Sequence, residues 1–132
     1  MKNAEKLLAL LLIATMLTGC GRQQELAVVV ERVDVICAYS GKTLLRTYSQ
    51  SPKMTVLLSY LQWLAPKHRA DCDPEKLTGD VYRITLFMSD GEKAVYRQKT
   101  NGYLQKNEGP WECIDPEKGK QLQLLLEAME SD

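Results

Sequence analysis

The 132-residue sequence lacks an excess of charge of either sign, because 17 Lys and Arg residues balance 17 Asp and Glu residues. A protein that binds nucleic acid through its phosphates usually shows a basic excess, so we expect no nucleic-acid partner. The absence of net charge, together with 45% apolar residues, is also atypical of a disordered chain. The length fits a single globular domain.

Motifs of the common hydrolases, zinc proteases, phosphate-binding loops and dinucleotide-binding folds are absent. Histidine is nearly absent: the single residue, His68, lies four residues before Cys72. The neighbouring Asp71 and Asp73 disfavour a reactive thiolate, because nearby negative charge raises a thiol pKa. A zinc site here would lack a fourth ligand. We therefore expect no enzymatic activity, no metal and no non-covalent cofactor.

A membrane-spanning apolar run is also missing. Residues 7–17 form an apolar stretch of eleven residues, which follows a charged start with two lysines and one glutamate. Eleven helical residues span only about 16 Å, whereas a bilayer core requires about 20 residues. A charged start, a short apolar stretch and small residues at its end are typical of a secretory signal. The sequence therefore predicts a signal peptide at residues 1–19.

The apolar stretch ends in Leu17-Thr18-Gly19-Cys20, a leucine and two small residues before a cysteine. This pattern resembles the lipobox of bacterial lipoproteins. The resemblance implies cleavage before Cys20 and a covalent lipid, with acyl chains such as palmitate, on its thiol. It also implies a protein anchored on the extracytoplasmic face of the cell membrane, since two or three acyl chains hold a protein stably on a bilayer. Residues 20–25 would then be the lipidated cysteine and a short polar tether.

Residues 26–132 are predicted to form one α+β domain. Alternating apolar residues and turn signals such as Asp90-Gly91 and Asn101-Gly102 predict strands, and two Ser/Asp-Pro pairs predict helix starts. The expected order is strands 26–39 and 43–49, helix 52–65, strands 81–88, 92–99, 103–106 and 111–114, then helix 116–130. The simplest fit is two layers, an antiparallel sheet of five or six strands with both helices on one face. This plan is similar to that of many small bacterial lipoproteins, which implies architecture only.

Three cysteines remain once Cys20 is assigned to lipid. Thiols outside the cytoplasm tend to pair, so one disulfide is expected. A helix that returns to the level of the first hairpin would bring Cys72 near Cys37, which favours a Cys37–Cys72 bond. A four-stranded meander would bring Cys113 to the same level, so Cys72–Cys113 is the alternative. A structure with all three thiols reduced is the third possibility.

Tyrosines and arginines on the expected strands are candidates for a binding face. Tyrosine offers a large contact area with a polar tip, and arginine offers a cation. If one sheet face is uncovered, the residues expected to line it are Arg46, Tyr48, Arg83, Tyr96 and Arg97. The sequence thus favours a membrane-anchored, non-enzymatic binding or accessory module for an envelope protein or a small ligand. A small enzyme that uses a free cysteine and a structural subunit of an envelope complex are the alternatives.

Overall fold

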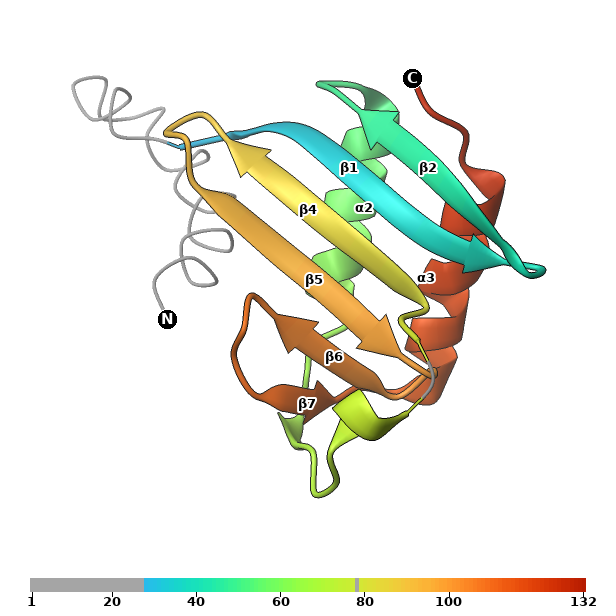
Figure 1. Ribbon diagram of the computed structural model, residues 1–132. Coiled ribbons are helices and arrows are strands. Elements are labelled where there is room, and N and C mark those ends of the chain that lie inside the picture. The colour runs from blue at the N-terminus through green and yellow to red at the C-terminus, as the bar shows by residue number, and fades with distance from the viewer. Residues whose placement is uncertain (1–27, 78) are drawn as a thin grey trace.

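A computed structural model describes residues 28–77 and 79–132. The expected signal peptide (1–19), Cys20 with its tether (20–25) and the first residues of the expected strand at Leu26 lie outside the described residues. The described chain folds into one antiparallel sheet of seven strands with two α-helices behind it (Figure 1). The predicted α+β class, antiparallel sheet and helix number are therefore confirmed.

The strands follow the strand boundaries expected from the sequence to within a few residues. Their bounds are β1 (Val30–Tyr39), β2 (Lys42–Tyr48), β3 (His68–Arg69), β4 (Tyr82–Met88), β5 (Lys93–Lys99), β6 (Tyr103–Lys106) and β7 (Trp111–Cys113). The helices are α2 (Pro52–Trp63) and α3 (Pro116–Ala128), and a 3₁₀ turn, η3 (Pro74–Lys76), precedes β4. The short strand β3 was expected to be loop, so the sheet has seven strands where five or six were expected.

Local sequence signals explain where the helices and hairpins begin. The Ser51 hydroxyl accepts a hydrogen bond from the Met54 N–H at 3.2 Å, and the Asp115 carboxylate accepts one from the Glu117 N–H at 2.9 Å. Each cap is followed by a proline at the first helical position. In the β4–β5 hairpin Gly91 has φ of 89°, a left-handed conformation that glycine adopts without strain.

The strand order in the sheet is β2-β1-β4-β5-β6-β7-β3. Strand β2 therefore forms one edge and β3 forms the other, although α2 and a short loop are all that separate them in sequence. Helix α2 runs behind the sheet from one edge towards the other (Figure 1). Tertiary structure, not local sequence, decides this crossing, and it determines which cysteines and loops come together.

The core lies between the sheet and the two helices. Alternate residues of β1 and β4 face the helices and are almost fully buried: Val33, Val35, Cys37, Tyr82, Ile84 and Leu86. Leu57 and Leu61 of α2 and Leu122 and Leu126 of α3 complete this layer. Both helices lie on the same face, so the opposite face of the sheet is left open among the described residues (Figure 1).

Candidate functional site

The open face of the sheet carries a continuous cross-strand row of side chains. Directly opposed residues of an antiparallel sheet share a face, and the strand register joins, in order from β2 to β7, Leu45, Ile36, Arg83, Arg97, Gln105 and Trp111. The row is apolar and exposed at the β2 end, where 69% of Leu45 and 47% of Ile36 are accessible. It is cationic at the centre and polar to aromatic at the β7 end.

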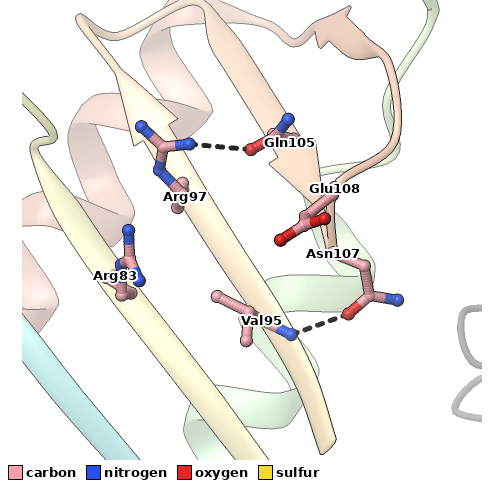
Figure 2. A pocket seen from close by; sticks show the side chains of 6 residues that line it. All are labelled: Arg83, Val95, Arg97, Gln105, Asn107 and Glu108. Carbon is pink, nitrogen blue, oxygen red and sulfur yellow. Dashed lines mark hydrogen bonds between the residues drawn. The ribbon is translucent and has the colours of Figure 1, made fainter.

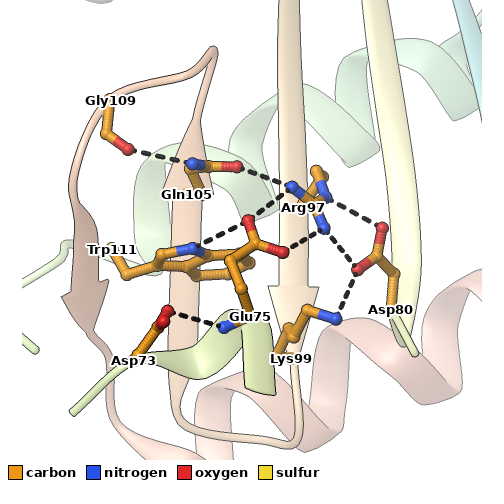
Figure 3. Close-up of polar contacts among 8 residues, drawn as sticks. All are labelled: Asp73, Glu75, Asp80, Arg97, Lys99, Gln105, Gly109 and Trp111. Atoms are coloured by element: carbon orange, nitrogen blue, oxygen red, sulfur yellow. Dashed lines mark hydrogen bonds and ion pairs between the residues drawn. The ribbon is translucent and has the colours of Figure 1, made fainter. Parts of the chain in front are cut away.

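Arg97 is the most heavily bonded side chain of this row (Figure 3). Its Nε and Nη2 donate to the two oxygens of Asp80 at 2.9 and 3.0 Å. Its Nη1 and Nη2 donate to the two oxygens of Glu75 at 3.0 and 3.2 Å, and Nη1 also donates to Gln105 Oε1 at 3.0 Å. The guanidinium therefore has two bidentate carboxylate partners, the strongest arrangement that arginine makes.

The residues around Arg97 hold these partners in place. Asp73 caps η3 by accepting the Glu75 N–H at 3.1 Å, and Trp111 Nε1 donates to Glu75 Oε2 at 3.2 Å (Figure 3). The Trp111 ring lies 5.3 Å from the Arg97 guanidinium carbon. These contacts tie the chain that links β3 to β4 onto the open face of β5 and β7.

The charges in this cluster shift the pKa values of its members. The hydrogen bonds that Arg97 donates to Asp80 and then to Glu75 raise the pKa of Arg97. The hydrogen bond from Arg97 lowers the pKa of Glu75. Burial opposes the ionisation of Asp80, but hydrogen bonds from Arg97 and Lys99 outweigh it, so the pKa of Asp80 is also lowered. Glu75 and Asp80 are therefore ionised and Arg97 is protonated near neutral pH, and Arg97 is occupied by protein carboxylates rather than available to a ligand.

Arg83 is the cation that this arrangement leaves available. It is exposed, and within residues 28–77 and 79–132 no ion pair or hydrogen bond engages its side chain. Arg83 borders a hollow of about 370 Å³ on the open face, lined also by Val95, Arg97, Gln105, Asn107 and Glu108 (Figure 2). Because Arg97 is saturated, the Arg83 guanidinium supplies the positive charge of this hollow.

The opposite wall of the hollow is the turn after β6. Asn107 Oδ1 accepts the Val95 N–H at 3.0 Å, and the Asn107 N–H donates to the Val95 carbonyl. This pair of bonds fixes Asn107, whose amide NH₂ is left to contact a ligand. Glu108 is exposed, and no ion pair engages it in the described part of the chain. The hollow thus combines a cation and a carboxylate, neither of them paired with another described residue, above the apolar side chain of Val95.

The structure brings together only part of the predicted binding face. Arg83 and Arg97 are directly opposed on β4 and β5 and both lie on the open face, as predicted for these two residues. Tyr48 and Tyr96 lie on the opposite, helix-covered face and are buried, so they cannot line it. The Tyr48 hydroxyl donates to the Met129 carbonyl at the end of α3, and Arg46 reaches the Glu127 carbonyl on the same side. Side chains alternate along a strand, which is why these residues point away from Arg83.

The predicted Cys37–Cys72 disulfide is wrong for this fold, and all three described cysteines are free thiols. Cys37 is buried on β1, whereas Cys72 follows β3 at the far edge of the sheet. Five strand spacings of about 4.8 Å, roughly 24 Å in all, separate β1 from β3, whereas a disulfide requires Cα atoms within about 7 Å. The predicted return of the chain to the first hairpin fails because α2 crosses to the opposite edge.

The alternative partners, Cys72 and Cys113, lie at one edge of the sheet. Cys113 is directly opposite Tyr103 in the β6–β7 pair. The Cys72 thiol hydrogen-bonds the Tyr103 hydroxyl and raises its pKa, and charge at Cys113 contributes in the same direction. Tyr103 therefore adjoins both thiols.

The residues around Arg83 in the hollow, Gln105, Asn107 and Glu108, were not predicted from the sequence. A signal for them was available, because the Asp90-Gly91 and Asn101-Gly102 turns set the register of β4, β5 and β6. Counting back from those turns places Arg83 opposite Arg97 and Arg97 opposite Gln105. The ion pairs of Arg97 with Glu75 and Asp80 had no such signal, since they depend on how the loop before β4 folds over the sheet.

No known family model, curated protein or solved structure matches this chain. Among residues 28–77 and 79–132, no group of three or more histidine, cysteine or acidic side chains is arranged to hold a metal ion. In the same part of the chain, neither helix has the length and apolar character needed to cross a bilayer.

Proposed function

We propose that this protein is a lipid-anchored extracytoplasmic binding module. The proposed lipid anchor is based on the Leu17-Thr18-Gly19-Cys20 motif at the end of an eleven-residue apolar run. A covalent diacylglycerol on Cys20 would hold the domain beside the membrane, because only a short polar segment separates this cysteine from the first strand.

The hollow beside Arg83 is the proposed ligand site. The Arg83 guanidinium and the Glu108 carboxylate lie on different walls, and neither is neutralised by a described protein group. A ligand with a carboxylate for Arg83 and an amine for Glu108 would satisfy both charges, while Asn107 would hydrogen-bond its polar centre. This chemistry fits a zwitterion such as an amino acid or a short peptide. No nucleophile lines the hollow, so the proposed role is binding.

Metabolic labelling with a tagged fatty acid tests the anchor. We expect the parent chain to take up label and to fractionate with membranes, and we expect Cys20→Ala to lose both properties. Cys113→Ala is the matched control, because its thiol is described as free and lies outside the lipobox. Equal labelling of the parent and the Cys20→Ala variant would refute lipidation at this position.

Calorimetric titration with free amino acids and dipeptides tests the ligand site. Loss of one charge-assisted hydrogen bond costs about 1.5–3 kcal/mol, so Arg83→Ala should weaken binding at least roughly tenfold. Glu108→Gln should weaken binding of ligands that carry a free amine. Arg32→Ala, at an exposed arginine of the same face but outside the hollow, is the matched control. Equal affinity for the parent and Arg83→Ala would disprove this site.

A further inference from the structure

Helix α2 presents a solvent-facing surface without charge. Its buried residues face the sheet, whereas its exposed positions after the first residue, Pro52, are Thr55, Val56, Ser59, Gln62 and Trp63. Lys53, in the first turn, is the only charged residue of the helix. A surface helix of a soluble domain normally carries charged residues on its outer face, and an outer face without charge suits a helix that is covered. The accessible fractions of Val56 (41%) and Trp63 (40%) show that no described residue covers it.

The uncharged surface continues onto α3. Ser59, Tyr60 and Trp63 line a shallow hollow of about 430 Å³ with Gln121 of α3. The Tyr60 and Trp63 rings meet edge to face, with 5.4 Å between their centroids. At the rim, the Lys118 ammonium lies 5.1 Å from the Trp63 ring centroid and donates to the Trp63 carbonyl at 3.0 Å. Tryptophan and tyrosine with a flanking lysine are the residues that anchor proteins at the membrane–water interface.

The chain enters the domain beside this surface. Val29 and Val30, at the start of β1, line a hollow together with residues 50–52, 54 and 55 at the beginning of α2. Residues 21–27 separate Cys20 from Val28, and this segment reaches at most roughly 27 Å when fully extended. Helix α2 is about 18 Å long. A lipid on Cys20 would therefore hold the outer face of α2 within reach of the bilayer surface.

We propose that the outer face of α2, defined by Thr55, Val56, Ser59, Gln62 and Trp63, rests on the membrane that holds the lipid. This inference depends on the proposed lipidation of Cys20. A weak contact is sufficient, because the anchor makes the encounter intramolecular. The helices lie behind the sheet and the Arg83 hollow lies on its other face (Figure 1), so this placement directs the ligand site away from the bilayer.

The two tryptophans allow a direct test. Trp63 is exposed on α2, whereas Trp111 is 8% accessible on the opposite side of the sheet. The full lipidated chain is purified from membranes and reconstituted into phosphatidylcholine vesicles with spin-labelled acyl chains near the headgroups. Tryptophan emission is then measured for the parent and for Trp63→Phe. The variant emits only from Trp111, so its emission is subtracted from that of the parent to give the emission of Trp63. We expect at least a twofold quenching of Trp63 emission and no change in Trp111 emission.

A second variant examines the contact without removing the probe. Val56→Glu places a charge at an exposed position of the outer face, so the domain should fold as before, which far-ultraviolet circular dichroism checks. It should reduce the quenching of Trp63 at least twofold. Lys120→Gln, which also lowers the net charge by one unit but lies on α3 outside the surface defined above, should leave the quenching unchanged.

The possible failures are distinguishable. A chain that takes up no fatty acid refutes the proposed anchor and this inference together. A lipidated chain whose Trp63 is unquenched refutes this inference alone and leaves the anchor intact. Protection of Trp63 from aqueous iodide without quenching by labelled lipid would mean that a second copy or another protein covers α2, and it would also overturn the proposal.

Discussion

Substitution of Gly119 by alanine separates two opposing effects on stability. Gly119 lies near the start of α3, where alanine is intrinsically favoured over glycine by about 1 kcal/mol. Helix propensity alone therefore predicts that Gly119→Ala stabilises the protein. Tertiary packing predicts the reverse, because Gly119 is buried against the turn between β5 and β6.

The magnitude follows from the distances at this contact. A Cβ atom at position 119 would lie 2.1 Å from the Asn101 carbonyl oxygen and 3.1 Å from Gln98 Nε2. Contacts of a Cβ closer than 3.0 Å essentially never occur, so backbone must move by about 0.9 Å. Gln98 is fully buried and donates to the Thr100 and Gly119 carbonyls at 2.8 and 3.4 Å, so it cannot easily withdraw. Overpacking of this kind costs about 1–3 kcal/mol or more.

The clash is with backbone, which cannot rotate away, so the cost of overpacking lies at about 2–3 kcal/mol. After subtracting the propensity gain of about 1 kcal/mol, we expect Gly119→Ala to be destabilising by about 1–2 kcal/mol. In a domain of this size that change lowers Tm by roughly 4–8 °C per kcal/mol. Urea and thermal unfolding, followed by circular dichroism, measure both quantities. Gly102→Ala is the matched control, since a Cβ there meets nothing within 4 Å. A Gly119→Ala variant as stable as the parent, or more stable, would refute the close approach of α3 to this turn.

Three further predictions concern the buried and charged groups of the sheet. The Tyr82 hydroxyl is buried without a hydrogen-bond partner among the described residues, so Tyr82→Phe should raise the unfolding free energy by up to about 1 kcal/mol; a lower Tm would contradict this. The pKa of Asp80 is lowered in the folded state, so its bond to Arg97 contributes stability above the usual aspartate pKa of about 4, and this contribution is lost as the pH falls through the lowered value. Urea titrations at several pH values should therefore show that the unfolding free energy of Asp80→Asn falls less steeply with decreasing pH than that of the parent. Mild oxidation with diamide should link Cys72 to Cys113, which both adjoin Tyr103; peptide mapping that finds Cys37 in the bond instead would disprove that placement.

Local signals in the sequence were sufficient to locate almost every element. The cap residues Ser51 and Asp115 start the two helices as expected, since capping depends on neighbours within three residues. The Asp90-Gly91 turn places β4 and β5 correctly, because a tight hairpin fixes its own register. Strand β3 was not predicted because its two residues pair only with β7, which is distant in the sequence and leaves no local pattern.

The candidate site was predictable in part. Adjacent residues of a strand point to opposite faces, so Tyr96 and Arg97 could not both line one surface, and the sequence alone contained that constraint. The hollow itself required knowledge of which face the helices cover. The availability of Arg83 required a further fact, that Glu75 and Asp80 from the preceding loop neutralise Arg97.

The amino-acid sequence by itself determined the order of the helices and of every strand except β3, their turns and caps, and the alternation that makes one side of the longer strands apolar. These properties depend on neighbours within a few residues, whose influence on φ and ψ and on burial is direct. Only the tertiary structure decided that α2 crosses the sheet, that Cys72 lies far from Cys37, and that Arg97, but not Arg83, is paired with carboxylates of the described chain. Those outcomes depend on contacts between residues distant in the chain, which form only when the helices cover one face of the sheet and leave the other open.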